Sequence, residues 1–312
     1  MLRAYNRLPT IARGMLLMVL TTLCFACMQS MIKWLAAVGD TPLHPFEIAF
    51  FRNLFGLVAL VPMLFSSGFA GALRAFKTPR PGAHLLRAVV QTVGMLCFFT
   101  AVTMVPLAEV TSLSFSAPLF ATTLAVLIMG ERIRLRRITA LVIGFAGVLL
   151  VLRPGIEAIS TGAILAIVSS LCWGFAMTVI KSLSRTDSAL TLTLYAGVYL
   201  AIFTAIPAAM YWSAPTLNQL VWLLGIGTVG TLGHLAFAQA LRIADMSAVL
   251  PLDFMRLVWA SAIGFFVFSE VPSLIAWMGG ALIFSSATYI AVREAQLARS
   301  AAARKRNAAV DK

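Results

Sequence analysis

The stretches LCFACMQSMIKWL (23–35) and LCWGFAMTVIKSL (171–183) carry one pattern at two distant places in the chain. Aligned without a gap, they share the leading Leu-Cys, the Ile-Lys near the end and the final Leu. Each stretch lies in an apolar run preceded at the same distance by a glycine, Gly14 in the first run and Gly162 in the second. This self-similarity predicts that the chain contains an internal repeat.

A second pair of stretches supports the repeat. TVGMLCFFTAVTMVPLAEVT (92–111) and TVGTLGHLAFAQALRIADMS (228–247) both begin TVG-x-L and end in Ala-acid-x-Ser/Thr. Two colinear matches are hard to attribute to shared hydrophobicity alone. We therefore predict a first half at 14–152 and a second half at 161–292, with a short N-terminal segment, 1–13, and a basic tail, 293–312.

The composition is that of a membrane protein. Hydrophobic residues make up 61% of the chain and charged residues 11%, with a mean hydropathy of +0.94, whereas soluble domains have about 45–50% and 25%. Apolar runs of spanning length predict an all-α membrane protein with ten transmembrane helices. Pro106 divides 84–129, which is too long for one span. The runs are 14–35, 45–65, 84–104, 107–129, 137–152, 161–181, 189–211, 218–240, 246–268 and 273–292.

The basic residues predict the topology. Twenty of the 24 Lys and Arg residues lie on one side of the predicted membrane, in the two terminal segments, in alternate connections or at the adjoining ends of spans, while Arg153 stands alone on the other side. The positive-inside rule then places both termini in the cytoplasm of a multi-pass inner-membrane protein. This bias explains the pI of about 10.5 without a nucleic-acid partner. The Ala-rich tail is expected to be frayed and to touch lipid headgroups of the bilayer.

An odd number of spans in each half has a structural consequence. With five helices per half, the second copy enters the membrane from the side opposite to the first. The prediction is therefore two inverted five-helix repeats, an architecture that secondary transporters use around a solute site near the midplane.

The chain resembles the drug/metabolite transporter superfamily of the EamA two-repeat kind. The resemblance rests on the helix-end residues Lys33 and Lys181 and on two stretches, PLAEVTSLSFSAPLFATTLAVLIMGERI (106–133) and AVLPLDFMRLVWASAIGFFVFSEVPS (248–273). It implies ten helices, a central cavity and alternating access. Family members move amino acids, amines, drugs, riboflavin or S-adenosylmethionine in either direction, so the solute does not follow from the resemblance.

These observations favour a secondary transporter of small organic metabolites, of the amino-acid or related-metabolite efflux class. An uptake carrier for a heterocyclic solute such as S-adenosylmethionine or riboflavin is one alternative, and an intramembrane lipid-modifying enzyme is another. The sequence contains no Walker A, H-E-x-x-H or G-x-S-x-G motif. We therefore predict no catalytic residue, metal or cofactor, and a small-molecule solute as partner.

Arg52 is the first candidate for a solute contact. It lies about eight residues into the second span, which is too deep for easy snorkelling. An ionisable group at that depth either binds a carboxylate or phosphate of the solute or is neutralised within the protein. Asp253 and Arg256, three residues apart in the ninth span, could neutralise each other, or the carboxylate could carry the proton of a coupled cycle.

Further candidates are polar or aromatic residues within apolar runs, and each could equally serve packing. Pro118 and Pro251 are candidate gating positions because proline permits kinks, and Lys33 and Lys181 are candidate topology anchors that snorkel. Gly144-x-x-Gly147 or Gly279-Gly280 could form a homodimer face or pack within one chain. The remaining candidate solute contacts are His234, Gln91, Gln29, Trp173 and Tyr195.

Overall fold

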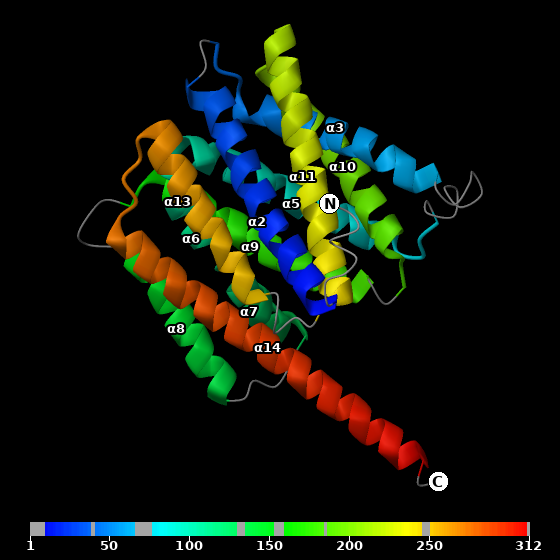
Figure 1. Ribbon diagram of the computed structural model, residues 1–312. Coiled ribbons are helices and arrows are strands. Elements are labelled where there is room, and N and C mark those ends of the chain that lie inside the picture. Colours follow the sequence, from blue (N-terminus) through cyan, green and yellow to red (C-terminus); the bar gives the residue numbers. More distant parts are fainter. Residues whose placement is uncertain are drawn as a thin grey trace.

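The computed structural model describes residues 10–38, 41–65, 77–129, 135–152, 159–183, 186–244 and 250–310 (Figure 1). All regular elements within these ranges are helices, which confirms the all-α prediction for them. They are α2 (Thr10–Lys33), a π-helical turn (Trp34–Val38), α3 (Pro45–Phe65), α5 (Pro81–Met104), α6 (Leu107–Ser114), α7 (Ala117–Met129), α8 (Leu135–Leu152), α9 (Thr161–Leu183), α10 (Ala189–Met210), α11 (Leu217–Ile243), η2 (Leu250–Phe254), α13 (Met255–Phe268) and α14 (Leu274–Val310).

Many of these helices have the length and surface of membrane spans. In the described part of the chain, six helices are long and apolar enough to cross a bilayer, and two shorter apolar helices accompany them. Large apolar side chains are exposed, among them Val58, Ile206 and Phe266 at 56%, 65% and 82%. Such a surface suits lipid rather than water. The six spans are Ile11–Val38, Pro45–Pro62, Pro81–Met104, Thr161–Ile180, Thr191–Met210 and Leu217–Phe237.

Proline residues divide the apolar runs. The predicted division at Pro106 is confirmed, because α5 ends at Met104 and α6 begins at Leu107. The fourth run is divided again just before Pro118, where α6 stops at Ser114 and α7 starts at Ala117. The ninth run likewise begins as the short 3-10 helix η2, which contains Pro251, before α13 starts. At both predicted kink sites the α-helix is therefore interrupted rather than bent.

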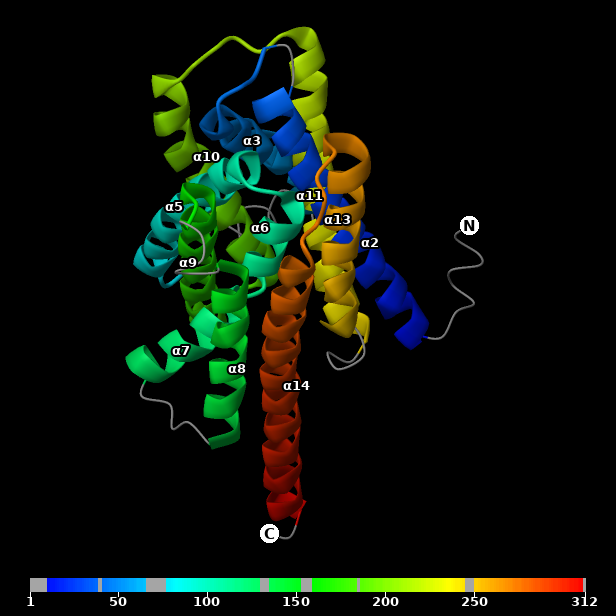
Figure 2. The same ribbon diagram turned by 90° about the vertical axis from the view of Figure 1, so that its left-hand side faces the viewer.

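The C-terminal tail differs from the expectation. We expected a frayed tail after residue 292, but α14 continues as one helix to Val310. Alanine and long charged residues have high intrinsic helix propensity, which explains why the Ala-rich tail extends the last span. In both views α14 projects well beyond the other helices (Figures 1 and 2).

The closest helix packing joins the two predicted halves. The most extensively packed pairs are α5 with α9, α2 with α11, α8 with α14, and α3 with α10. Each pair takes one helix from 14–152 and one from 161–292. Figure 1 shows α2 and α11 side by side at the centre of the bundle, and α14 alongside α8.

The repeated stretches supply close contacts within these pairs. A β-carbon added at Gly94 of α5 would lie 2.7 Å from the Cβ of Cys172 in α9. In the other half, a β-carbon at Gly233 of α11 would lie 3.1 Å from the Cβ of Cys24 in α2. Because the missing side chains let the backbones approach, small residues set the spacing of both helix pairs.

Glycines also bring α8 and α14 together. Gly147 and Gly279 face each other, so that a β-carbon at Gly279 would lie 2.8 Å from the carbonyl oxygen of Gly147. Ser286 of α14 donates a hydrogen bond to the carbonyl of Ala140 in α8. Gly144 and Gly280 also face neighbouring helices of the same chain. These glycine faces therefore pack within one chain, and a homodimer stays a prediction.

The α8–α14 contact can be tested by adding side-chain volume. Gly279→Val should lower the free energy of unfolding by about 1–3 kcal/mol, because overpacking forces the two backbones apart. Gly82→Ala is the matched control, since no atom lies within 4 Å of a β-carbon at that position. Thermal unfolding of the purified protein in detergent would measure both variants. Equal stability of Gly279→Val and the control would contradict the observed packing.

Candidate functional site

Arg52 lies where α3 meets α11 and α2. A β-carbon added at Gly230 of α11 would lie 3.6 Å from Nε and 3.8 Å from Nη2 of Arg52, and 2.7 Å from Sδ of Met28 in α2. The missing side chain at Gly230 therefore makes room for the guanidinium. Arg52 Nη1 donates a 2.9 Å hydrogen bond to Oδ1 of Asn53. Asn53 is buried and donates in turn to Thr204 of α10 at 3.4 Å, which connects Arg52 to a further helix.

The guanidinium of Arg52 has no anionic partner in the described part of the chain. The ion pairs there involve other cations, and the hydrogen bond to Asn53 uses a single Nη1 donor. Arg52 is half-buried. A guanidinium is always charged and presents five donors, so this arrangement leaves Nε and Nη2 free for a bidentate contact with a carboxylate or phosphate.

His234 belongs to the same region. It follows Gly230 by one helical turn, which puts both residues on the same face of α11. Its side chain is exposed, and its ring meets the ring of Phe25 in α2 edge to face, with centroids 4.9 Å apart. The structure thus brings together Arg52 and His234, two of the predicted solute contacts, and adds Phe25, which sequence reasoning did not single out.

Asp253 and Arg256 form a separate group. Their predicted pairing is present, with Asp253 Oδ2 3.4 Å from Arg256 Nη2. Asp253 lies in the 3-10 helix η2, however, and not in the α-helix of the ninth span as we expected, because the run is interrupted at Pro251. The guanidinium carbon of Arg256 stands 4.8 Å from the ring centroid of Phe115. Arg256 is thus neutralised by Asp253 and covered by an aromatic ring.

The other predicted contacts are distributed over the bundle. Gln29 is buried and accepts a 3.1 Å hydrogen bond from Thr111 of α6, which joins two helices. Gln91 is buried on α5, and its Oε1 has no hydrogen-bond partner in the described residues. Tyr195 packs on α5 through His84, as described next. Trp173 is 41% exposed on α9.

Sequence reasoning missed a buried polar cluster at the start of α5. His84 is fully buried, with Nε2 3.8 Å from Oδ2 of Asp187 and the ring 4.6 Å from the ring of Tyr195. Arg87 is also buried and donates a 2.7 Å hydrogen bond to the carbonyl of Leu192 in α10. Counting Arg87 among the cytoplasmic basic residues concealed this contact, because a charge count does not show where a side chain points.

Asp187 carries a negative charge in this cluster. Partial burial acts to raise the pKa of its carboxyl, but hydrogen bonds from Thr78 and Thr186 and the nearby His84 outweigh it and hold the pKa below its ordinary value. Asp187 follows α9, and His84 lies in the first turn of α5. The cluster therefore joins the two predicted halves at the end where α5 starts.

Lys33 does not snorkel as expected. It is buried, and its ammonium pairs with the carboxylate of Glu270 and donates a 2.9 Å hydrogen bond to the carbonyl of Val105. The hydrocarbon stem of lysine could reach the interface, but an acceptor and an acid inside the protein bind the ammonium instead. The side chains of Lys181 and Pro251 lie outside the described residues.

An experiment can decide whether Asp253 only neutralises Arg256 or carries a proton during transport. If the pair only neutralises charge, Asp253→Asn should lower stability by about 1–3 kcal/mol, because the part-buried cation of Arg256 loses its acid. In a double-mutant cycle with Arg256→Met, measured by unfolding in detergent, the two effects should then be strongly non-additive. Additive effects on stability, with loss of transport driven by a pH gradient, would instead indicate that Asp253 carries a proton.

Comparison with known proteins agrees with this architecture. Residues 12–153 and 160–292 each match the sequence profile of the EamA-like transporter family. A solved crystal structure superposes with a TM-score of 0.57 at 17% identity, over 92% of this chain and 99% of that one, which supports the fold.

Three curated relatives have names that specify different solutes. They are an S-adenosylmethionine uptake transporter of Rickettsia bellii (28% identity, 81% of this chain, 86% of that one), a riboflavin transporter of Vibrio cholerae (29%, 92% and 95%) and a pseudopaline exporter of Pseudomonas aeruginosa (27%, 88% and 95%). The two profile matches together cover most of the residues. The chain therefore belongs to the EamA-like transporter family, a family of membrane transporters.

Proposed function

We propose that this transporter moves a small, amino-acid-related metabolite out of the cell, and that Arg52 binds the carboxylate of the solute. The observation that carries the proposal is the guanidinium of Arg52, which has no acid beside it in the described residues although it lies well within α3. A charge within the membrane is costly unless it is paired or hydrated. A solute carboxylate would supply the missing partner.

The surroundings of Arg52 suit such a solute. Nε and Nη2 face the space left by Gly230, and His234 and Phe25 lie one turn along the same helix pair. A planar fork can hold a carboxylate through two hydrogen bonds. The edge-to-face rings of His234 and Phe25 offer a polar and an apolar contact to the remainder of the molecule. Together these residues provide both orientation and charge recognition.

We further propose alternating access between two inverted five-helix repeats, 14–152 and 161–292, in the inner membrane. Two observations support it: the colinear repeats of sequence and the interruption of the fourth and ninth runs. Discontinuous helices beside a repeat interface are typical of secondary transporters. The segments 1–13 and 293–312 are then cytoplasmic ends.

Uptake of a heterocyclic solute is the second candidate, because relatives are named for S-adenosylmethionine and riboflavin. S-adenosylmethionine carries an amino-acid carboxylate, which Arg52 could bind, whereas riboflavin carries none. A lipid-modifying enzyme has no comparable support.

Counterflow in proteoliposomes tests the proposal. Vesicles with the purified protein would be loaded with each member of a panel of amino acids, S-adenosylmethionine and riboflavin, and given the labelled solute outside, with and without a pH gradient. We expect saturable exchange of a carboxylate-bearing solute. Arg52→Ala should raise the half-saturation concentration of that solute about 10–100-fold, which corresponds to the loss of one charge-assisted hydrogen bond. Arg52→Lys should raise it less.

The control for these variants is Arg293→Ala, because the Arg293 guanidinium donates an exposed hydrogen bond to Gln296 of its own helix, in the C-terminal segment. Unchanged exchange by folded Arg52→Ala would contradict the role of Arg52. The direction of net flux in right-side-out and inside-out vesicles would distinguish efflux from uptake. Flux of riboflavin alone, insensitive to Arg52, would favour the second candidate.

The proposed topology has a separate test. Green fluorescent protein fused after Lys312 should fluoresce, because the tail is placed in the cytoplasm, and alkaline phosphatase inserted in the 153–160 connection should be active, because that connection is placed outside. The reporters exchanged between the two sites serve as controls. An active phosphatase on the tail would overturn the assignment of the termini.

A further inference from the structure

We propose that Lys33 and Glu270 form a gate between the two halves, one that holds the bundle closed where α2 and α13 end and that opens once in each transport cycle. The inference rests on the alternating access proposed above, and it assigns Lys33 and Glu270 as positioning residues for transport. Their contacts, their burial and the elements they join support it.

Four polar groups meet at this gate. The Lys33 ammonium pairs with Oε1 of Glu270 and donates to the carbonyl of Val105 at 2.9 Å. The second oxygen of Glu270, Oε2, accepts a 2.9 Å hydrogen bond from the N–H of Leu107. Only 11% and 15% of the Lys33 and Glu270 side chains are exposed. Both charges are thus neutralised inside the protein.

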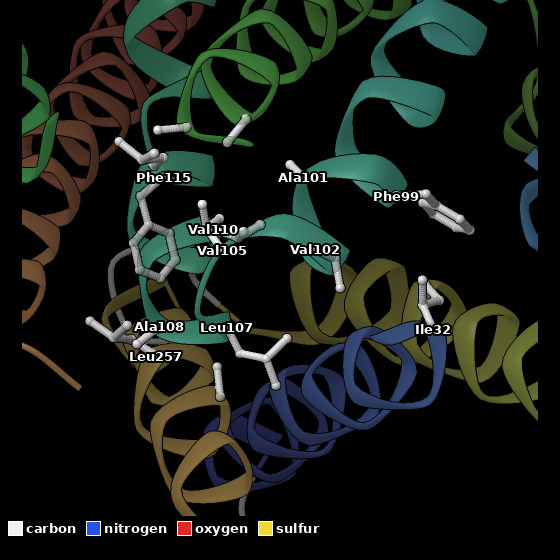
Figure 3. Close-up of a cluster of buried hydrophobic side chains, with 14 of the residues drawn as sticks. Ile32, Phe99, Ala101, Val102, Val105, Leu107, Ala108, Val110, Phe115 and Leu257 are labelled. Carbon is white, nitrogen blue, oxygen red and sulfur yellow. The ribbon is translucent and has the colours of Figure 1, made fainter. Parts of the chain in front are cut away.

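The gate closes on the break between α5 and α6. Val105 follows the last residue of α5, and Leu107 is the first residue of α6. The free carbonyl at a helix C-terminus attracts a cation, and the free N–H at a helix N-terminus attracts an anion. Figure 3 shows Leu107 at the break, with α2 on one side of it and α13 on the other. The ion pair therefore binds complementary backbone ends.

The turn after α13 fixes the carboxylate of Glu270. Ser269 has a left-handed backbone, with φ of 55°, and the N–H of Glu270 donates a 3.0 Å hydrogen bond to the carbonyl of Gly264. A β-carbon at Gly264 would lie 2.8 Å from Oε2 of Glu270. A larger residue at Gly264 would therefore displace the acid. The second half thus presents Glu270 in one orientation toward the first half.

This contact has the properties of a two-state element. Lys33, Val105 and Leu107 come from the first half, and Glu270 comes from the second. If the two halves separate here, water must hydrate both charges and both backbone groups together. The reason is that each of the four groups is hydrogen-bonded or ion-paired to another of them. A partly opened contact would leave buried groups unpaired, which is more costly than either the closed or the hydrated state.

The opposite end of the bundle has its own contact between the halves. Because α5 runs from Pro81 to Met104, the His84–Asp187 cluster lies at the end of α5 remote from Val105. Arg87 also bonds across the halves there, to Leu192 of α10. Alternating access needs one closure at each end of the solute path, and the structure provides a polar contact between halves at both.

Thiol labelling tests the gate without any solute. Cys24 would be the single reporter, with Cys27, Cys97 and Cys172 changed to serine, because Cys24 is part-buried on α2 against Gly233. A membrane-impermeant thiol reagent would be added to vesicles from the side where α2 ends. Glu270→Gln removes the ion pair but retains an acceptor for the N–H of Leu107, so labelling should become at least about tenfold faster. Arg293→Gln is the surface control.

Lys33→Gln tests the same equilibrium between the closed and the open gate from the other partner of the ion pair, and it should also accelerate labelling of Cys24. Exchange of the two charges, Lys33→Glu with Glu270→Lys, should not restore the wild-type rate. It would place a carboxylate beside the carbonyl of Val105 and an ammonium beside the N–H of Leu107, so both backbone contacts would be repulsive. Restoration of the closed state by this exchange would show that the charges alone hold the contact and would overturn the account.

The alternative is that the ion pair only ties the fold together. The monodisperse fraction of each variant would be labelled, so that loss of folded protein is separated from opening. Unchanged labelling of Cys24 in folded Glu270→Gln and Lys33→Gln would overturn the gate. Because labelling needs no solute, failure of the counterflow panel would leave this result interpretable, and failure of the gate would leave the role of Arg52 standing.

Discussion

A bilayer does not hydrate charges, so each ionic group within it must find a partner in the protein, in water or in a solute. The described spans of this chain satisfy that requirement group by group. Lys33 pairs with Glu270, and Arg256 with Asp253, while the buried guanidinium of Arg87 binds a backbone carbonyl. Arg52, like Arg87, has only a neutral partner in the described residues, the amide of Asn53. Arg87 is buried, however, whereas Arg52 is half-buried beside the space left by Gly230. The proposed function rests on this difference in exposure.

The sequence predicts the helices well and the polar contacts poorly. A helix is determined by residues close together in the chain, whereas a polar contact often joins residues far apart in it. Hydropathy and proline act locally, so the spans and the division at Pro106 could be read directly. The partners Lys33 and Glu270 are 237 positions apart, and nothing local shows which way the lysine points. Equally, the depth of Arg52 was apparent from the run it lies in, but its place over Gly230 needed the packing of α3 against α11.

The repeated stretches help to explain why the most extensively packed helix pairs join the two halves. Small residues in the repeated stretches let α5 approach α9 and let α11 approach α2. Polar contacts also join the two halves near both ends of α5, through Glu270 at one end and through Arg87 at the other. Such a frame can serve many solutes. Relatives named for S-adenosylmethionine, riboflavin and pseudopaline match this chain at 27–29% identity over most of its length. Specificity in such a fold resides in a few side chains at the site rather than in the architecture.

The most direct test of the central claim compares one solute with its methyl ester. Once counterflow identifies a solute, binding of the acid and of the ester would be measured for the wild type and for Arg52→Met. We predict that the wild type binds the acid at least about tenfold more tightly than the ester and that Arg52→Met removes most of this difference, since the guanidinium then has no carboxylate to recognise. Equal discrimination by both proteins would contradict the account, because the carboxylate would then be bound elsewhere.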